Sequence, residues 1–509
     1  MRMEMKKKPF RLAALLMCAA MVLSGCGAKD APSPQTTLPP AAAPLMVPEN
    51  DSMQMAALPV LFYLPSADGQ RLTAVPGTAE LSVSRHGAEK MCQMLFDHPG
   101  TENALPLSDY VSLSATEPVE VSRNVATVSL SASALRLSHE ELFMVCQSIT
   151  NTLCQYGDIR YVNVLISGVQ PGVDVAATLP AGCFQPNTRD DLNVLWSRAN
   201  ARKDAGRATI TAALYYPAAG AKGVLCEARP LSFTDMSAPG MVSTLLEALH
   251  AGPETMEGLP SYPDFFTYMT KAPEVNEVNG SRRVVLYFDV SFNGAIIENG
   301  ITRSVMVASL VYTIVTFLPG VDGVEMHIGD ETILSLTPSA TYVGAGETIS
   351  FEDGLMERND FLPFLLSTCT LYFADDNGML CKVERAVPYY ESRSARAVVN
   401  QLARGNIGYD SREGLKPVLP DALRDADLIG IAFAEDTLIL NFSEHFVSLC
   451  QGMDGEQEKR LVYALVNSLC HLQGVKKVQI LVSGTQPDTL AGGIYLPGAF
   501  LPNQDLVAP

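Results

Sequence analysis

The chain has 509 residues, of which 47% are hydrophobic and 18% are charged, a composition typical of globular protein with a sizeable core. At roughly 100–200 residues per domain, this length indicates about three domains. The formal charge of −19 argues against nucleic acid as a partner, because phosphate binding requires clustered Lys and Arg. It also argues against a polybasic contact with anionic lipid.

The N-terminus has the pattern of an export signal. Three lysines, Lys6 to Lys8, precede a short apolar run at residues 10–23, which is too short for a comfortable membrane span. The run ends in Leu23-Ser24-Gly25-Cys26, which resembles the lipobox of bacterial lipoproteins. We therefore expect a signal peptide over residues 1–25, a lipid on Cys26 and a location on the extracytoplasmic face of the cell membrane. The alternative is an ordinary cleavable signal in which the cysteine is a coincidence.

A segment rich in Pro and Ala follows, over residues 26–55. It contains six prolines and no hydrophobic periodicity, which predicts an extended tether. In polyproline geometry, at about 3 Å per residue, this tether would hold the folded part a few tens of ångströms from the membrane. No later stretch is apolar for long enough to span a bilayer.

An internal repeat dominates the rest of the chain. Residues 140–172 and 456–488 match without a gap at an offset of 316, so that Asn151, Cys154 and Ser167 fall on Asn467, Cys470 and Ser483. A more diverged copy lies at residues 303–331, offset by 154 from the last one. A repeat on this scale decides the architecture before any single residue does.

The local patterns around each copy predict the same order of elements. In the first copy we expect a strand at 62–64, a helix at 88–96 and a hairpin turning at Arg123-Asn124. In the second we expect a strand at 214–216, a helix at 241–250 and a turn at Asn279-Gly280. In the third we expect a hairpin around Asn377-Gly378 and a helix at 394–402, with Ser392 or Ser394 as its N-cap. A second hairpin is expected at 428–442, with its turn at Glu435-Asp436. Each copy then closes with an amphipathic helix and a strand.

These elements predict an α+β fold of three tandem repeats, each with the order hairpin, helix, hairpin, helix, strand. Each repeat would place two helices on one face of a small, mostly antiparallel sheet. The alternating residues of the hairpin at 428–442 predict one buried face. We expect the domains to cover residues 56–190, 191–345 and 346–509.

Two stretches of the second copy carry a family resemblance. Residues 245–253 read LLEALHAGP and are followed by Gly258-Leu259-Pro260, and residues 310–321 read LVYTIVTFLPGV. These stretches resemble the GerMN domain of spore germination and sporulation proteins, and the third copy supports the likeness at residues 395–404 and 461–475. The resemblance implies lipoproteins with such domains in tandem, a fold similar to ring-building motifs of extracytoplasmic complexes, and an assembly role without catalytic activity. The first copy departs from the family's Gly-Pro turn with His98-Pro99-Gly100.

The residues give no support to catalytic or metal chemistry. The seven histidines form no HExxH motif, and the nine cysteines besides Cys18 and Cys26 show no CxxC spacing. Cys154 and Cys470 recur amid apolar residues and are interpreted as core positions, whereas Cys369 and Cys381 are the best candidates for a disulfide. We therefore expect no enzyme, and no catalytic, cofactor-binding or metal-binding residues.

Two polar motifs are interpreted as turns rather than sites. The run of Asp375-Asp376-Asn377-Gly378 lacks the alternating ligands and distant Glu of a calcium loop. The Ser-Gly-x-Gln-Pro sequences that begin at Ser167 and Ser483 stand where each last strand ends, which favours a structural turn over a nucleophile.

Two functions remain open. The first is a membrane-anchored, non-enzymatic scaffold or assembly factor in sporulation or spore germination, which binds other envelope or sporulation proteins through exposed sheet edges and helix faces. The second is a ligand-binding or cell-wall-associated lipoprotein with a pocket between its domains. The single Trp196 is poor provision for stacking on sugars, although Tyr389 and Tyr390 could contribute.

Overall fold

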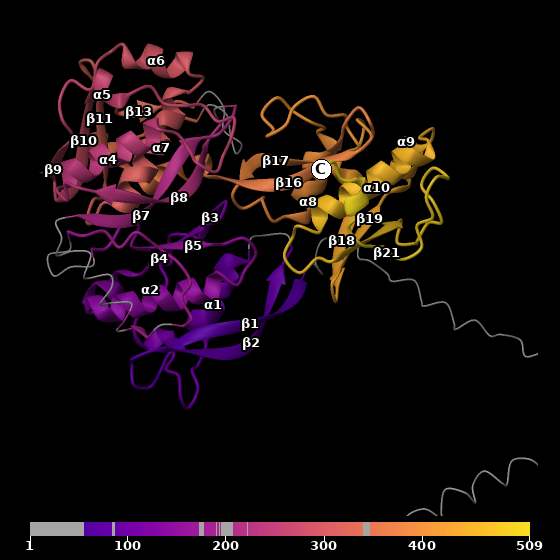
Figure 1. Cartoon of the computed structure of the whole chain (residues 1–509), viewed down its shortest axis with the longest axis horizontal. Coiled ribbons are helices and arrows are strands. Elements are labelled where there is room, and N and C mark those ends of the chain that lie inside the picture. Colours follow the sequence, from indigo (N-terminus) through magenta and orange to yellow (C-terminus); the bar gives the residue numbers. More distant parts are fainter. Residues whose placement is uncertain are drawn as a thin grey trace, which may run out of the picture. The chain divides into compact units, whose positions relative to one another are not determined.

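Three successive segments of the chain share one order of elements in the computed structural model: a long hairpin, a helix, a second hairpin, a helix and a strand (Figure 1). We call the segments at residues 55–184, 208–332 and 366–500 repeats 1, 2 and 3. The structure describes residues 55–83, 87–172, 178–189, 191–192, 194, 207–220, 222–338 and 347–509. The predicted signal, Cys26, the tether before residue 55 and Trp196 lie outside the described residues.

Repeat 1 forms two separate sheets. Its elements are β1 (Met55–Pro65), β2 (Leu72–Ser82), α1 (Ala88–Asp97), η1 (Leu107–Asp109), β3 (Glu120–Ser122), β4 (Val125–Leu130), η2 (Ala132–Arg136), α2 (His139–Leu153), β5 (Tyr161–Ile166) and β6 (Cys183–Phe184). Strands β1 and β2 pair with each other alone, whereas the second sheet has the order β3-β4-β5-β6 with β4 and β5 parallel. Helix α2 begins at Ser138, which forms a capping box with Glu141, and packs against both β1 and β5.

Repeat 3 follows the same plan. Its elements are β16 (Leu366–Ala374), β17 (Leu380–Pro388), α8 (Ala395–Ala403), η5 (Asp425–Asp427), β18 (Leu428–Ala434), β19 (Thr437–Phe442), α9 (Glu444–Cys450), α10 (Gly455–Leu469), β20 (Lys477–Val482) and β21 (Ala499–Phe500). The sheet order is β18-β19-β20-β21, again with the two middle strands parallel. Helix α8 begins at the predicted cap Ser394, and α10 begins at Asp454, which forms a capping box with Gln457.

Repeat 2 has the same pairings in a more elaborate form. Its elements are β7 (Ala208–Pro217), β8 (Val224–Phe233), α4 (Ala238–His250), α5 (Phe265–Tyr268), β9 (Glu274–Val278), β10 (Ser281–Phe288), α6 (Phe292–Glu298), α7 (Arg303–Phe317), β11 (Gly323–Ile328) and β12 (Glu331–Thr332). Strands β10 and β11 are parallel. Strand β12 pairs with the C-terminal end of β11, and β15 (Met356–Glu357) pairs with its N-terminal end. The segment that leads into repeat 3 contains β13 (Ser335–Leu336), β14 (Ile349–Ser350), η3 (Glu352–Gly354) and η4 (Arg358–Phe364).

The offsets between the repeats in sequence also relate the bounds of their helices and strands. Adding 316 to the bounds of α2 and β5 gives the bounds of α10 and β20, and adding 154 to the bounds of β11 also gives those of β20. Helix α7 lies two residues later than the same offset predicts, so its connection to β11 is shorter. The three predicted turns at Arg123, Asn279 and Glu435 all have a left-handed residue, with φ of 53°, 53° and 56°. The α+β class and the order of elements are confirmed.

The prediction of one buried face for the hairpin at 428–442 is wrong for its second strand. In β19, Leu438, Leu440 and Phe442 face the core of repeat 3, but Ile439 is also only 1% exposed. Ile439 packs with Ala432 and Leu481 on the opposite face of the sheet. The corresponding strand β4 is buried at every position. Central strands in this fold are therefore covered on both sides, which periodicity alone did not reveal.

Each repeat has its own hydrophobic core, but some residues of repeat 1 belong to the core of another repeat, as Val125 of β4 does in the core of repeat 2. Ala56 and Val83, from the ends of the β1–β2 hairpin, belong to the core of repeat 3 rather than that of repeat 1. The main-chain N–H of Ala395, at the start of α8, donates to Val83 O over 2.9 Å. The first hairpin thus reaches from its own repeat to the first helix of the third.

Within the described residues, no single helix has the length and apolarity required to cross a bilayer. Helices α6 and α7 meet that requirement only as a pair, and the pair is bent by 99°. Every residue of α7 except Arg303 is buried in the fold.

Candidate functional site

A buried ion pair joins repeat 1 to the segment that follows repeat 2. Arg358, at the start of η4, donates from both terminal nitrogens to the two carboxylate oxygens of Glu120 in β3, over 2.8 and 2.5 Å. The two side chains are 6% and 4% exposed. Arg358 also donates to Thr316 Oγ1 over 2.9 Å and lies 4.7 Å from the centre of the Tyr312 ring. Burial by itself lowers the pKa of Arg358, but Glu120, Tyr215 and Tyr312 together more than offset this effect and the net pKa is raised.

Short polar contacts extend this junction to repeats 2 and 3. Ser122 Oγ donates to Leu366 O in β16 and accepts from the main-chain N–H of Cys226 in β8. The N–H of Arg123 donates to Ser367 Oγ over 2.9 Å. The end of β3 therefore contacts the first hairpin of both other repeats. Such a junction holds the described repeats in one arrangement, because breaking it would leave buried polar groups without partners.

The Ser-Gly-x-Gln-Pro motif of repeat 1 also makes an inter-repeat contact. Gln170 is 1% exposed, and its amide nitrogen donates to Thr316 O in α7 over 2.7 Å. Within the part of the chain that the structure describes, its counterpart Gln486 bonds only inside repeat 3, where it donates to Leu496 O and Gly498 O and accepts from Gln479 Nε2. Both motifs begin with a left-handed serine, since Ser167 and Ser483 have φ of 48°. The structure confirms that they are turns, and it gives Gln170 a contact that the sequence did not indicate.

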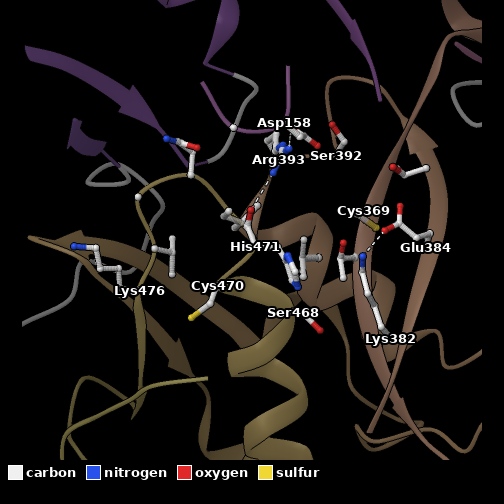
Figure 2. Close-up of a pocket in the computed structure, with 18 of the residues that line it drawn as sticks. Asp158, Cys369, Lys382, Glu384, Ser392, Arg393, Ser468, Cys470, His471 and Lys476 are labelled. Carbon is white, nitrogen blue, oxygen red and sulfur yellow. Dashed lines mark hydrogen bonds and ion pairs between the residues drawn. The ribbon is translucent and has the colours of Figure 1, made fainter. Parts of the chain in front are cut away.

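A groove of about 860 Å³ lies between repeats 1 and 3 (Figure 2). One side is formed by Leu58 and Pro59 of β1, and the other by Thr368 and Thr370 of β16. Its volume is in the range of about 300–1,000 Å³ that is usual for ligand clefts. The loops after α2 and α10 and the Ser392-Arg393 segment line the remaining walls. The alternative hypothesis requires a pocket between domains, and this groove is the candidate for it.

The polar side chains of the groove are partly paired with one another. Arg393 forms an ion pair with Asp158 and donates to His471 O over 2.9 Å, so it links the two repeats (Figure 2). Lys382 lies 2.9 Å from Glu384 in an exposed ion pair. Burial lowers the pKa of Arg393, and it is also the largest cause of the lowered pKa of His471, to which nearby Lys382 contributes.

Six of the nine described cysteines are buried, and Cys154, Cys183 and Cys470 are half-buried against the cores. All nine cysteines of the described residues are free, so Cys369 and Cys381 form no disulfide. In the hairpin register Cys369 pairs with Arg385 and Cys381 with Phe373, which separates the two thiols along the strands. Burial raises the pKa of Cys154 and of Cys470 to about 12, which keeps both thiols protonated and unreactive near neutral pH.

The acidic run at the tip of the β16–β17 hairpin is a turn. Asp375 Oδ1 accepts from the main-chain N–H groups of Asn377 and Met379, over 2.9 and 2.8 Å. Gly378 has the positive φ of 81° that such a turn requires. Among the described residues, no group of three or more His, Cys, Asp or Glu could hold a metal ion.

The family profile for sporulation and spore germination, named Germane, matches residues 61–171 and 370–488. These two matches lie in repeats 1 and 3. Each begins within the first strand and covers the rest of the first hairpin, the second hairpin, both helices and the fifth strand. This chain is a GerMN-domain protein. The profile does not extend over repeat 2, whose likeness to its neighbours comes from the shared order of elements and strand pairings.

Three solved structures are similar to parts of this chain. Tandem GerMN domains of the sporulation protein GerM from Bacillus subtilis match with 16% identity and a TM-score of 0.22, over 59% of this chain and all of that one. A putative lipoprotein from Clostridium perfringens matches with 18% identity and a TM-score of 0.20, over 28% of this chain and 93% of that one. The first GerMN domain of GerM matches with 20% identity and a TM-score of 0.20, over 27% and 98%. No curated protein matches the chain.

Proposed function

We propose that this GerMN-domain protein is a lipid-anchored, non-enzymatic scaffold on the extracytoplasmic face of the cell membrane. The GerMN domains support a role in sporulation or spore germination. The observation that carries the scaffold is the buried junction around Glu120 and Arg358, which fixes the repeats as one composite surface. A protein that organises partners benefits from such preorganisation, because a fixed surface avoids the entropy cost of ordering separate domains on binding.

The anchor part of the proposal rests on Cys26 and the signal-like residues before it. Replacement of Cys26 by Ala should release the protein from the membrane fraction and abolish incorporation of a labelled fatty acid. The matched control is Cys18→Ala, which changes a cysteine inside the predicted signal and should leave both readouts intact. Labelling that persists in the Cys26→Ala protein would overturn the anchor.

The scaffold part is tested by cross-linking during sporulation. Intact cells that express the full chain should yield cross-links to other envelope proteins, and these cross-links should decrease in an Arg358→Met variant, whose junction is broken. Cross-links confined to copies of this chain, with unchanged sporulation and germination in a deletion strain, would contradict the scaffold.

The 860 Å³ groove favours a second candidate, a ligand-binding or cell-wall-associated lipoprotein. This function predicts that soluble wall fragments or sugars raise the melting temperature of the full chain by several degrees. It also predicts that a bulky substitution at the groove wall, such as Thr370→Trp, removes the shift. An unchanged melting temperature with every such compound would exclude this candidate.

A further inference from the structure

The main-chain groups of successive residues in strand β16 point alternately toward its partner strand β17 and outward, away from it. Three of its residues bond away from its partner β17: Leu366 O accepts from Ser122 Oγ, the N–H of Tyr372 donates to Ser468 Oγ, and Ala374 exchanges main-chain bonds with Lys416. Because the period of a strand is two, the main-chain groups of Thr368 and Thr370 point in the same outward direction.

The opposite strand confirms this assignment. Thr370 pairs with Glu384 in the hairpin register. The N–H of Glu384 donates to Ser411 Oγ, and Glu384 O accepts from the N–H of Ser411. Both members of this pair therefore direct their main-chain groups outward. Among the described residues, nothing outside the hairpin bonds to the main chain of Thr368 or Thr370.

Repeat 1 closes the same edge with a side chain. Gln155 donates to Leu61 O over 2.7 Å and accepts from the N–H of Leu61 over 3.0 Å. The next outward residue along β1, Tyr63, donates to Thr152 Oγ1, just as Tyr372 donates to Ser468 Oγ. The strand position that corresponds to Leu61 is therefore Thr370. The helix position that corresponds to Gln155 is His471, 316 residues later.

His471 does not replace the bonds of Gln155. Its Nε2 lies 3.3 Å from the hydroxyl of Tyr372, and its ring stacks on the ring of that residue. The imidazole thus lies beside the edge without bonding to the main chain of Thr370. This substitution between the repeats leaves the main-chain groups of Thr370 open to the groove, next to those of Thr368, the preceding outward residue of β16.

The groove around this open edge carries more positive than negative charge. Its lining includes Lys382, Arg393 and Lys476 against Asp158 and Glu384, whereas the whole chain has a formal charge of −19. Lys382 and Lys476 pair with Glu384 and Asp436 over 2.9 and 4.0 Å. The two lysine side chains are 50% and 74% exposed, so their ammonium groups can also reach an occupant of the groove. Across the groove, Pro59 has no N–H and cannot compete for the same acceptors.

We propose that the groove binds an extended acidic peptide segment of a partner protein, which adds as a strand along Thr368 and Thr370. The segment makes main-chain hydrogen bonds to both threonines, and its carboxylates face Lys382 and Lys476. This inference rests on the proposed scaffold function, since it names the kind of partner segment that the scaffold holds.

Retention of peptides on the full-length chain, immobilised in detergent, tests the proposal. Three pools of end-blocked seven-residue peptides are compared: one with Glu at alternate positions and random residues elsewhere, one with Lys at those positions, and one with Glu and N-methylated alternate amides. We expect the glutamate pool to be retained at least tenfold more than the other two. Hydrogen exchange at Thr368 and Thr370 should slow when the retained peptides are added.

The matched variant is His471→Gln, which introduces the glutamine that bonds both main-chain groups of the strand edge in repeat 1. It should fold, because Gln155 occupies the corresponding position, and it should reduce retention at least tenfold. Lys382→Glu keeps the edge open and should shift retention from the glutamate pool to the lysine pool. Equal retention on the wild type and His471→Gln, or no retention of the glutamate pool, would overturn the proposal.

This experiment separates the inference from the function on which it rests. If the glutamate peptides are not retained but cells still yield cross-links to envelope proteins, the scaffold function is supported and its partners bind at another surface. If both fail, the scaffold function itself is wrong.

Discussion

Repeats 1 and 3 contain the same helix at an offset of 316 residues, yet the hairpins beside it differ at their edges. In repeat 1, Gln155 satisfies both main-chain groups of Leu61. In repeat 3, His471 turns to the hydroxyl of Tyr372 and leaves the edge at Thr370 open. An unpaired edge is a liability in a soluble protein unless it is covered or used. The comparison shows that a single polar side chain can decide whether a repeated fold presents a binding edge.

The two repeats also differ in how the first helix ends. Arg385 in β17 lies under the C-terminus of α8 and donates to Gln401 O and Gly405 O, over 2.7 and 2.6 Å. Repeat 2 has the same device in Arg229, which donates to Ala248 O and Gly252 O. Gly77 stands at the corresponding position of repeat 1, where a Cβ atom would lie 2.7 Å from the ring of Phe62. An aromatic ring therefore fills the space that an arginine takes in the other repeats.

The largest effect is expected when the buried arginine of repeat 3 is removed. Arg385 and Asp410 are 1% and 0% exposed and share two bonds of 2.7 Å. Arg385→Met leaves the carboxylate of Asp410 and the end of α8 without their cation, so the free energy of unfolding should decrease by about 3–5 kcal/mol. Urea unfolding measures this change.

The control is Lys416→Met, which removes an exposed ion pair with Asp376 and should cost about 0.2–1 kcal/mol. If the free energy of unfolding decreases equally in both variants, the C-terminal end of α8 does not depend on Arg385. The difference between Arg385 in repeat 3 and Gly77 in repeat 1 would then have no effect on stability.

A smaller effect, equal in both repeats, is expected at the paired asparagines. Asn151 exchanges two hydrogen bonds with the main chain of Asn187, and Asn467 does the same with Asn503. Both side chains come from buried helix positions, so replacement by Ala leaves main-chain groups unsatisfied. Each replacement should lower the free energy of unfolding by about 1–3 kcal/mol.

The matched controls for this pair are the exposed residues Glu140→Ala and Glu456→Ala, which lie 316 positions apart in the same two helices. Each should change the free energy of unfolding by less than about 0.5 kcal/mol. A loss at Asn467 without one at Asn151 would show that the two repeats use this position differently.

The smallest effect is the dependence of stability on pH that arises from His471 in repeat 3. Burial lowers the pKa of His471, Lys382 and Arg393 lower it further, and Glu384 opposes them. An unfolded histidine binds its proton near pH 6.5, so below that pH the unfolded state holds more protons and stability falls. The wild type should therefore lose more stability than His471→Gln between pH 7.5 and pH 5.

Urea unfolding at both pH values measures this difference. His98, whose pKa burial also lowers, is present in both proteins and cancels from the comparison. Identical losses in the two proteins would show that His471 titrates as it does in the unfolded chain.

The sequence predicted the repeat, its offsets and its turns because these depend on local patterns. Hydrophobic periodicity and the repeat placed α2 and α10, and turn residues placed the hairpins at Arg123, Asn279 and Glu435. The repeat also matched Asn151 with Asn467, although it did not predict the hydrogen bonds that their side chains make. The same patterns identified Cys154 and Cys470 as core residues.

By itself, then, the sequence determined the family, the α+β class and the order of elements in each repeat. Tertiary structure alone decided which positions meet across repeats, such as Glu120 with Arg358, 238 residues apart. It also decided that Gln170 contacts a neighbouring repeat while Gln486 does not, and that His471 leaves an edge open. The physical reason is that burial and pairing depend on packing between segments distant in sequence, whereas periodicity reports only which face of a single element is buried.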